Sequence, residues 1–155
     1  MLILRYTTGD AVRSVLGLDD QDLSDQEMED RLIAQELSLD LKSWVPAHVG
    51  LYEASKGSVD ETIALGLELY STYFAAVVIL PALRLRAVQA VSDGKNSLER
   101  FTGIDWDALR AEMLAKLAQY KQVVSQAAAL ADQADIATPQ LFTIVGLGVD
   151  PVTGV

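Results

Sequence analysis

The sequence is organised around residues Ser58 to Phe101, which read SVDETIALGLELYSTYFAAVVILPALRLRAVQAVSDGKNSLERF. Ser58 and Glu61 have the spacing of a capping box, in which a hydroxyl and a carboxylate each accept a free backbone N–H group. This spacing predicts that a helix begins after Ser58. From Leu69 onward the segment is apolar on nearly every side, so we expect a helix surrounded by its own domain or by a neighbouring subunit.

Pro81 lies inside this apolar segment. Proline lacks a backbone donor and its ring clashes with the preceding turn, so we expect a kink or a break there. Ser58 to Leu80 would then supply the core, and Leu83 to Phe101 would make contacts outside it. The run from Leu69 to Leu83 is shorter than the ~20 apolar residues that span a membrane, so we interpret it as a core helix.

The chain has 155 residues, of which half are hydrophobic, and this length fits one domain with an appended arm. It has no cysteine, which excludes a disulfide framework and thiolate metal sites. Its net charge of −10 disfavours a general nucleic-acid-binding surface. Between Asp10 and Asp40 the sequence contains ten acidic residues and only two basic ones. This segment is either a solvated face or a surface that attracts the more basic middle of another copy.

Two helices are predicted before the central stretch. Thr8 is a plausible N-cap of a short helix, which Gly17 would end in the left-handed conformation. A capping box at Ser24 begins a second helix with apolar residues at steps of three and four. This helix is predicted to end at or near Trp44, because the residue before Pro46 avoids the helical region.

Residues Ala47 to Gly57 are predicted to form a connector. They contain His48, the only histidine of the chain. A single histidine without cysteines or a nearby pattern of carboxylates favours a structural or surface role over metal binding or catalysis.

Asp105 is a predicted N-cap of the last long helix, from about Trp106 to Ala131. Its apolar residues step by three and four along the whole length: Trp106, Leu109, Met113, Leu117, Tyr120, Val124, Ala128 and Ala131. Together these periodicities predict an all-α fold, a helical bundle of about four to five helices with an extended C-terminal arm.

The last part of the chain differs from the rest. We predict a helical domain over residues 1–132 and an extended arm over 133–155. Pro139 and Pro151 frame a β-like run from Leu141 to Val145. This run either packs along its own domain or docks on another chain by strand addition or groove filling, and we favour another chain.

No motif for catalysis or cofactor binding stands in a recognisable frame. A calcium loop at Asp20 to Asp22 fails, because Asp25 and Arg31 occupy its glycine and glutamate positions. We therefore expect no enzyme, no cofactor and no metal, although a helical enzyme with paired carboxylates and a divalent metal stays an alternative.

A basic set follows the apolar segment: Arg84, Arg86, Lys95 and Arg100. It could contact the acidic face of a neighbour or DNA passing nearby. Alternatively, it is ordinary surface charge paired within the chain to Asp93 or Glu99.

Three stretches, in this order and spacing, carry a resemblance to a protein family. They are YTTGDAVRSVLGL (Tyr6–Leu18) followed by DLSD (Asp22–Asp25), the apolar helix ending in AVSDG (Ala90–Gly94), and KNSLERF (Lys95–Phe101) before a long helix. Together they cover about Leu4 to Ala131. The chain resembles the small head–tail connector proteins, also called adaptor or head-completion proteins, of tailed bacteriophages.

This resemblance implies a structural virion protein of the head–tail neck, made in the host bacterial cytoplasm. It implies a ring, commonly of twelve copies, that lies under the portal protein, extends the DNA channel and docks the next neck or tail protein. DNA would pass without sequence-specific contacts, and no membrane would be involved. The residues we expect at the oligomer or portal interface are Leu141, Phe142, Ile144, Val145, Arg84, Arg86, Lys95 and Arg100. The alternative is a small acidic helical binding module that inhibits or regulates a partner protein.

Overall fold

The computed structural model describes residues 3–29, 32–92 and 104–136. This part of the chain contains six helices and one short antiparallel ribbon, in which Ile3 pairs with Thr8. The all-α helical bundle is therefore confirmed, with more helices than the four to five predicted. In chain order the elements are β1 (Ile3–Leu4), β2 (Thr7–Thr8), α1 (Gly9–Leu16), α2 (Asp25–Glu29), α3 (Ile33–Trp44), α4 (His48–Ser55), α5 (Thr62–Ser92) and α6 (Trp106–Ile136).

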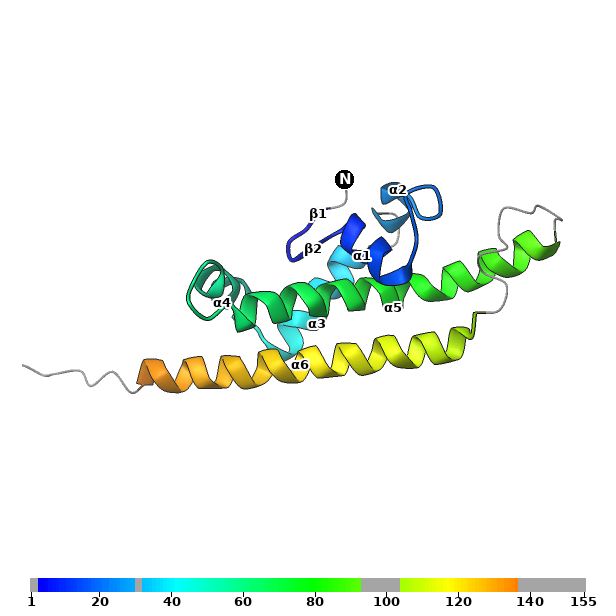
Figure 1. The fold of residues 1–155 in the computed structure, drawn as a ribbon. Helices are drawn as coiled ribbons and strands as arrows, with labels where there is room; N and C mark the ends of the chain where they lie inside the picture. The colour runs from blue at the N-terminus through cyan, green and yellow to red at the C-terminus, as the bar shows by residue number, and fades with distance from the viewer. Residues whose placement is uncertain (1–2, 30–31, 93–103, 137–155) are drawn as a thin grey trace, which may run out of the picture.

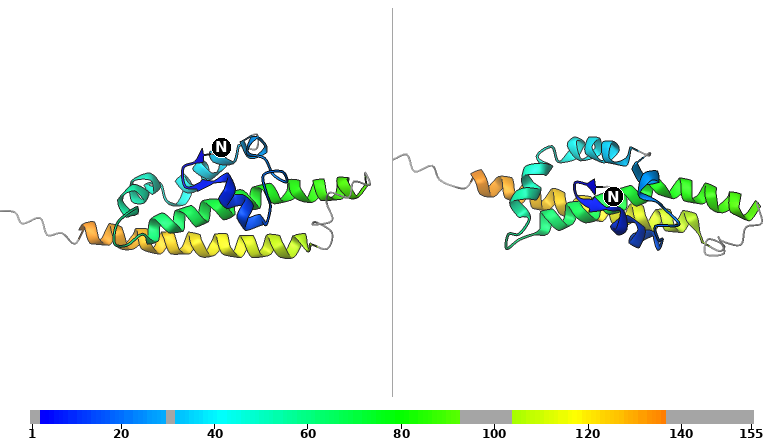
Figure 2. Two further views of the ribbon diagram at one scale, coloured as in Figure 1. Left: turned by 45° about the horizontal axis from the view of Figure 1, so that its top comes forward. Right: turned by 90° about the horizontal axis from the view of Figure 1, so that it is seen from above.

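Helix α5 is the centre of the molecule. It lies antiparallel beside α6, and each of these two helices has 31 residues (Figure 1). The shorter elements α1, α3, α4 and β2 also contact α5, so it lies between α6 and a layer of N-terminal elements (Figure 2). None of the side chains from residue 70 to residue 80 is exposed, which agrees with the predicted surrounded helix.

Two clusters of buried side chains make the core, and α5 contributes to both. The first lies around the C-terminal half of α5 and consists of Val12, Leu23, Met28, Ile33, Ala75, Ile79 and Leu83. The second lies around its N-terminal half and consists of Tyr6, Leu37, Leu41, Val45, Tyr52, Ala64, Leu67, Tyr70 and Val124.

A kink or a break was predicted at Pro81; helix α5 continues through this residue, so the break does not occur. Pro81 itself is exposed, whereas Leu80 and Leu83 on either side of it are buried. Packing on both sides of the proline therefore holds the helix through the loss of one backbone hydrogen bond. We also predicted that the core residues end at Leu80 and that residues from Leu83 onward make contacts outside the core. This prediction is wrong, because Leu83 belongs to the core.

The predicted caps at three helix ends are confirmed, together with the ending of α1. The Thr8 hydroxyl accepts a backbone N–H of α1 at 3.2 Å, and Gly17 ends that helix with a φ of 68°. Ser24 and Glu27 cap each other's backbone N–H groups at 3.1 and 3.4 Å. The Asp105 carboxylate accepts the N–H of the third residue of α6 at 2.9 Å. Such caps are local, and the short sequence pattern was sufficient to predict them at these three ends, although not at the start of α5.

The single helix predicted from Ser24 to Trp44 is instead two helices. Helix α2 ends at Glu29 and α3 begins at Ile33, directly after Leu32, which has a left-handed φ of 55°. Met28 and Ile33 would lie about 140° apart on one continuous helix, at 100° per residue. The break lets both side chains enter the first core cluster, while Leu32 is exposed.

The connector predicted from Ala47 to Gly57 is mostly helical, because α4 occupies His48–Ser55. No side chain caps its N-terminus, so the usual start signal is missing. Its buried residues, His48, Tyr52 and Ser55, nevertheless follow helical spacing.

The capping box predicted at Ser58 is also wrong. The Ser58 hydroxyl donates to the carbonyl oxygens of Ser55 and Asp60 and so closes a turn before α5. The Asp60 carboxylate accepts the N–H of Thr62 at 3.0 Å, at the true start of the helix. Glu61 reaches back to the N–H of Gly57 instead of Ser58.

Helix α6 follows the predicted stripe: Met113 and Val124 are buried, and Val124 belongs to the second core cluster with residues of α5. It continues to Ile136, so the predicted boundary at residue 132 falls inside a helix. The predicted turn at Asp93 and the predicted arm beyond residue 136 lie outside the described residues.

Candidate interaction surfaces

Arg13 ties together the first stretch that carries the resemblance. Its buried guanidinium contacts Asp10 at 2.6 Å and Asp25 at 2.9 Å, and it donates to the Leu23 carbonyl oxygen at 3.0 Å. The hydrogen bond from Arg13 lowers the pKa of Asp25 below its ordinary value. This one side chain therefore joins α1 to the start of α2, next to the buried Leu23.

Gly9 makes room for this arrangement. A Cβ at Gly9 would lie 2.5 Å from Oδ1 of Asp25 and 2.8 Å from the terminal carbon of Met28. Both are closer than real Cβ contacts, so a side chain at Gly9 would displace the carboxylate that Arg13 holds.

The two described members of the basic set lie in different ion pairs. Arg84 contacts Asp107 of α6 at 3.1 Å, and both side chains are well exposed. Arg86 pairs with Glu27 of α2 and donates to the Asp22 carbonyl oxygen at 3.3 Å. The partners predicted from the sequence were Asp93 and Glu99, which lie outside the described residues.

Arg84 and Arg86 thus do not form one basic patch. Residues two apart on a helix do not face each other, and here one side chain points toward α6 and the other toward α2. The six other residues expected at the interface lie outside the described part of the chain: Lys95, Arg100, Leu141, Phe142, Ile144 and Val145.

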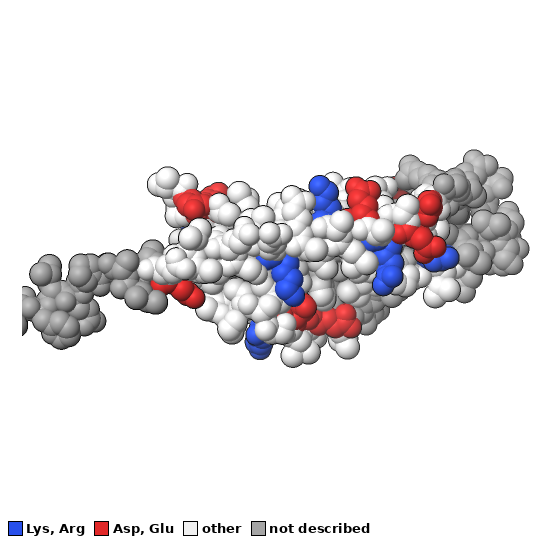
Figure 3. All heavy atoms as spheres, turned by 90° about the horizontal axis from the view of Figure 1, so that it is seen from below, with Lys and Arg blue, Asp and Glu red and all other residues white. Residues whose placement is uncertain are grey.

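Charges of both signs are mixed on the face of the molecule that α6 forms. Figure 3 shows acidic and basic side chains interspersed there, without an extended area of one sign. The described residues on this face therefore form no basic stripe of the kind that neutralises a nucleic-acid backbone.

Polar side chains are paired where β2 and α4 meet the core. The Tyr6 hydroxyl and Nδ1 of His48 lie 2.6 Å apart, and the hydroxyls of Thr7 and Thr72 lie 2.7 Å apart. Burial is the main cause that lowers the pKa of His48. These contacts fix the N-terminal ribbon to α4 and α5, and they give His48 a place in the interior.

Several large apolar side chains of the two long helices stay exposed: Leu65, Leu69, Leu85, Leu114 and Leu130. By length and composition alone, Thr62–Arg86 of α5 could also cross a membrane. However, 56% of its most apolar window is buried inside the fold, which is typical of a core helix.

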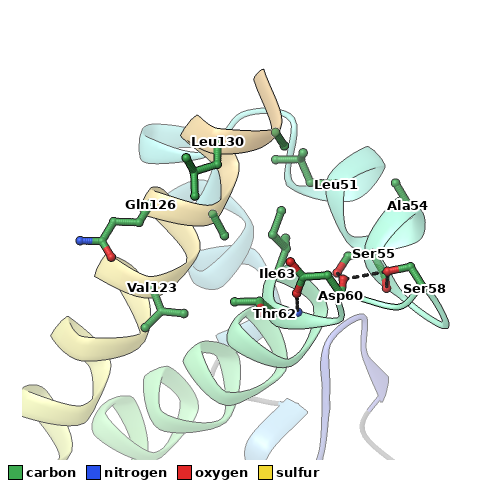
Figure 4. Close-up of a pocket in the computed structure, with 12 residues that line it drawn as sticks. Leu51, Ala54, Ser55, Ser58, Asp60, Thr62, Ile63, Val123, Gln126 and Leu130 are labelled. Carbon is green, nitrogen blue, oxygen red and sulfur yellow. Dashed lines mark hydrogen bonds between the residues drawn. The ribbon is translucent and has the colours of Figure 1, made fainter. Parts of the chain in front are cut away.

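A groove lies between α4, the start of α5 and the second half of α6 (Figure 4). It has a volume of about 600 Å³. It could not be predicted from the sequence, because three helices contribute to its walls. Among residues 3–29, 32–92 and 104–136, no group of three histidine, cysteine, aspartate or glutamate side chains is placed to hold a metal ion.

No protein-family model matches the chain, and neither a curated protein nor a solved structure matches it. These comparisons therefore neither support nor contradict the resemblance to phage connectors.

Proposed function

We propose that this chain is a structural virion protein of a tailed bacteriophage, a head–tail connector that forms a ring under the portal. In this role it would extend the DNA channel and dock the next neck or tail protein. The proposal builds on the order of the three stretches that resemble this family.

The observation that carries the proposal is that the two long helices do not cover their own apolar side chains. Leu65 and Leu69 are exposed on successive turns of α5, although this helix contributes more buried side chains to the described core than any other element. Leu114 and Leu130 are exposed on α6. The neighbouring pair Leu65 and Leu69 is an exposed apolar site at which another protein subunit could pack, and a ring of identical copies would supply that subunit.

The alternative, an acidic module that regulates a partner, needs its acidic residues clustered and available on one face. Three acidic residues of the N-terminal segment instead pair with arginines of the same chain, Asp10 and Asp25 with Arg13 and Glu27 with Arg86. These pairs favour a structural use of the acidic segment, so we do not pursue the alternative.

The proposal is tested by mixing the chain with the portal protein of the same phage and imaging the mixture by negative-stain electron microscopy. We expect an additional ring on the portal, commonly of twelve copies, and native mass spectrometry should give the copy number. Portal particles that stay unchanged at saturating concentrations of a folded chain would contradict the proposal.

Two variants sharpen this test. Replacement of both exposed leucines, Leu65→Lys and Leu69→Lys, should abolish the added ring while the chain stays folded. Gln119→Lys, at an exposed position of α6, is the matched control and should leave the ring intact. Deletion of residues 138–155 should weaken assembly onto the portal if the arm clasps a neighbour, as the sequence predicts.

A further inference from the structure

The groove beside α4 is open and apolar. Its apolar walls come from three helices and consist of Leu51, Ala54, Ile63, Val123, Ala127 and Leu130. In Figure 4 the side chains of Leu51, Ile63 and Leu130 border the same space. Leu130 is 66% exposed, so the wall is open to solvent at this residue.

Three polar side chains at the rim of the groove, those of Ser55, Ser58 and Asp60, already have hydrogen-bond partners within the chain. The Asp60 carboxylate accepts the N–H of Thr62, and the hydroxyls of Ser55 and Ser58 both donate to the Asp60 carbonyl oxygen. On α6, no charged residue occurs between Lys121 and Asp132. The groove is therefore suited to an apolar occupant without a charge.

The chain itself carries such an occupant close by. Leu141 to Val145 is an uncharged run of four apolar residues and one threonine, which starts five positions after the end of α6 at Ile136. Pro139 prevents a regular continuation of the helix into this run. In an extended conformation, Phe142 and Ile144 would point to the same side, because side chains alternate along a strand.

Residues 137–145 are long enough for the chain to turn back after Ile136 and to reach the groove along α6. Leu130 lies about 9 Å before Ile136 along the helix axis, at 1.5 Å per residue. The four residues 137–140 can span up to ~14 Å, which suffices for a reversal of direction. Five extended residues then cover about 16 Å, against roughly 10 Å of α6 between Val123 and Leu130.

We propose that the groove between α4, α5 and α6 binds residues Leu141–Val145 of the same chain, with Phe142 and Ile144 as its apolar anchors. This is the first of the two alternatives that the sequence leaves open, in place of the docking on another chain that the sequence pattern favoured. A tether of four residues gives the segment an effective concentration of about millimolar at the groove, which a second copy at micromolar concentration does not reach. The inference concerns the free chain and does not depend on the connector function.

The absence of cysteine from the chain makes disulfide trapping a clean test. Gln126 is at the rim of the groove and Thr143 would face away from it, so the pair Gln126→Cys and Thr143→Cys leaves both anchors in place. Ala129→Cys with Thr143→Cys is the matched control, because Ala129 is exposed on the same turn of α6 but does not line the groove. Both pairs are within reach of the tether.

In the dilute full-length chain, the pair at the groove should form an intramolecular disulfide about tenfold faster than the control pair. Ile144→Asp, a change outside the helical core, should remove this difference. Equal rates for the two pairs would overturn the proposal. Covalent dimers in a mixture of the two single-cysteine chains, formed as fast as the intramolecular bond, would instead make a second copy the occupant and would also overturn it.

Discussion

Gly66 of α5 lies against Val124 of α6 with no room for a side chain between them. A Cβ on Gly66 would be 2.6 Å from Cγ2 of Val124, whose side chain is fully buried. A side chain at residue 66 would therefore force either the Val124 side chain or the two long helices to shift.

Gly66→Ala should destabilise the protein, even though alanine stabilises a helix by about 1 kcal/mol relative to glycine. Overpacking typically costs about 1–3 kcal/mol, so we expect the free energy of unfolding to fall by about 1 kcal/mol, measured by urea denaturation. In a Val124→Ala background the obstruction is gone, and the same change should become neutral or stabilising.

Gly50→Ala in α4 is the control, because a Cβ there meets nothing within 4 Å. It should not destabilise the protein. If Gly66→Ala behaves like Gly50→Ala, the close contact between α5 and α6 is not as described.

The contact between Gly66 and Val124 also illustrates what the sequence could not predict. Caps such as Thr8 and Asp105 depend on a few neighbouring residues, and the pattern predicted them correctly. The break at Leu32 and the intact helix at Pro81 are decided by packing against distant parts of the chain. A single sequence does not specify such packing, since it depends on the register between helices.

The ion pairs and the groove show the same difference between local and distant contacts. The pair between Asp10 and Arg13 spans three residues of one helix, which sequence spacing can suggest. The partners of Arg84 and Arg86 come from other helices and were not predicted. The groove beside Leu130 needs three helices and has no sequence signature.

The two carboxylates around Arg13 should contribute unequally to stability. Arg13→Ala should cost about 1–3 kcal/mol, because it leaves the carbonyl oxygen of Leu23 and the Asp25 carboxylate without this donor. Asp10 is 84% exposed and Asp25 only 31%, so water screens the first pair more strongly. Urea denaturation should therefore rank the losses as Arg13→Ala, then Asp25→Asn, then Asp10→Asn. The reverse order for the two aspartates would show that burial does not decide their contributions.

His48 should make stability depend on pH. Burial lowers the pKa of His48 below its ordinary value of 6.5, so the folded state favours the neutral imidazole. Its contribution is present above pH 6.5 and is lost as the pH falls below that value, because the unfolded chain then binds the proton more readily. Between about pH 7 and pH 5, the free energy of unfolding should fall more steeply for the wild type than for His48→Gln. Parallel curves would exclude His48 as the cause.

Arg84 should contribute less than Arg86 to the free energy of unfolding, although only one residue separates them. The pair between Arg84 and Asp107 is exposed, 55% and 81%, so Arg84→Glu should change the free energy of unfolding by less than about 1 kcal/mol. Arg86 joins α5 to Glu27 and to the Asp22 carbonyl oxygen, so Arg86→Glu should destabilise the chain more. If the ring exists as proposed, Arg84→Glu should still weaken ring assembly or DNA retention in a folded protein. A folded Arg84→Glu chain that assembles and retains DNA like the wild type would make Arg84 ordinary surface charge.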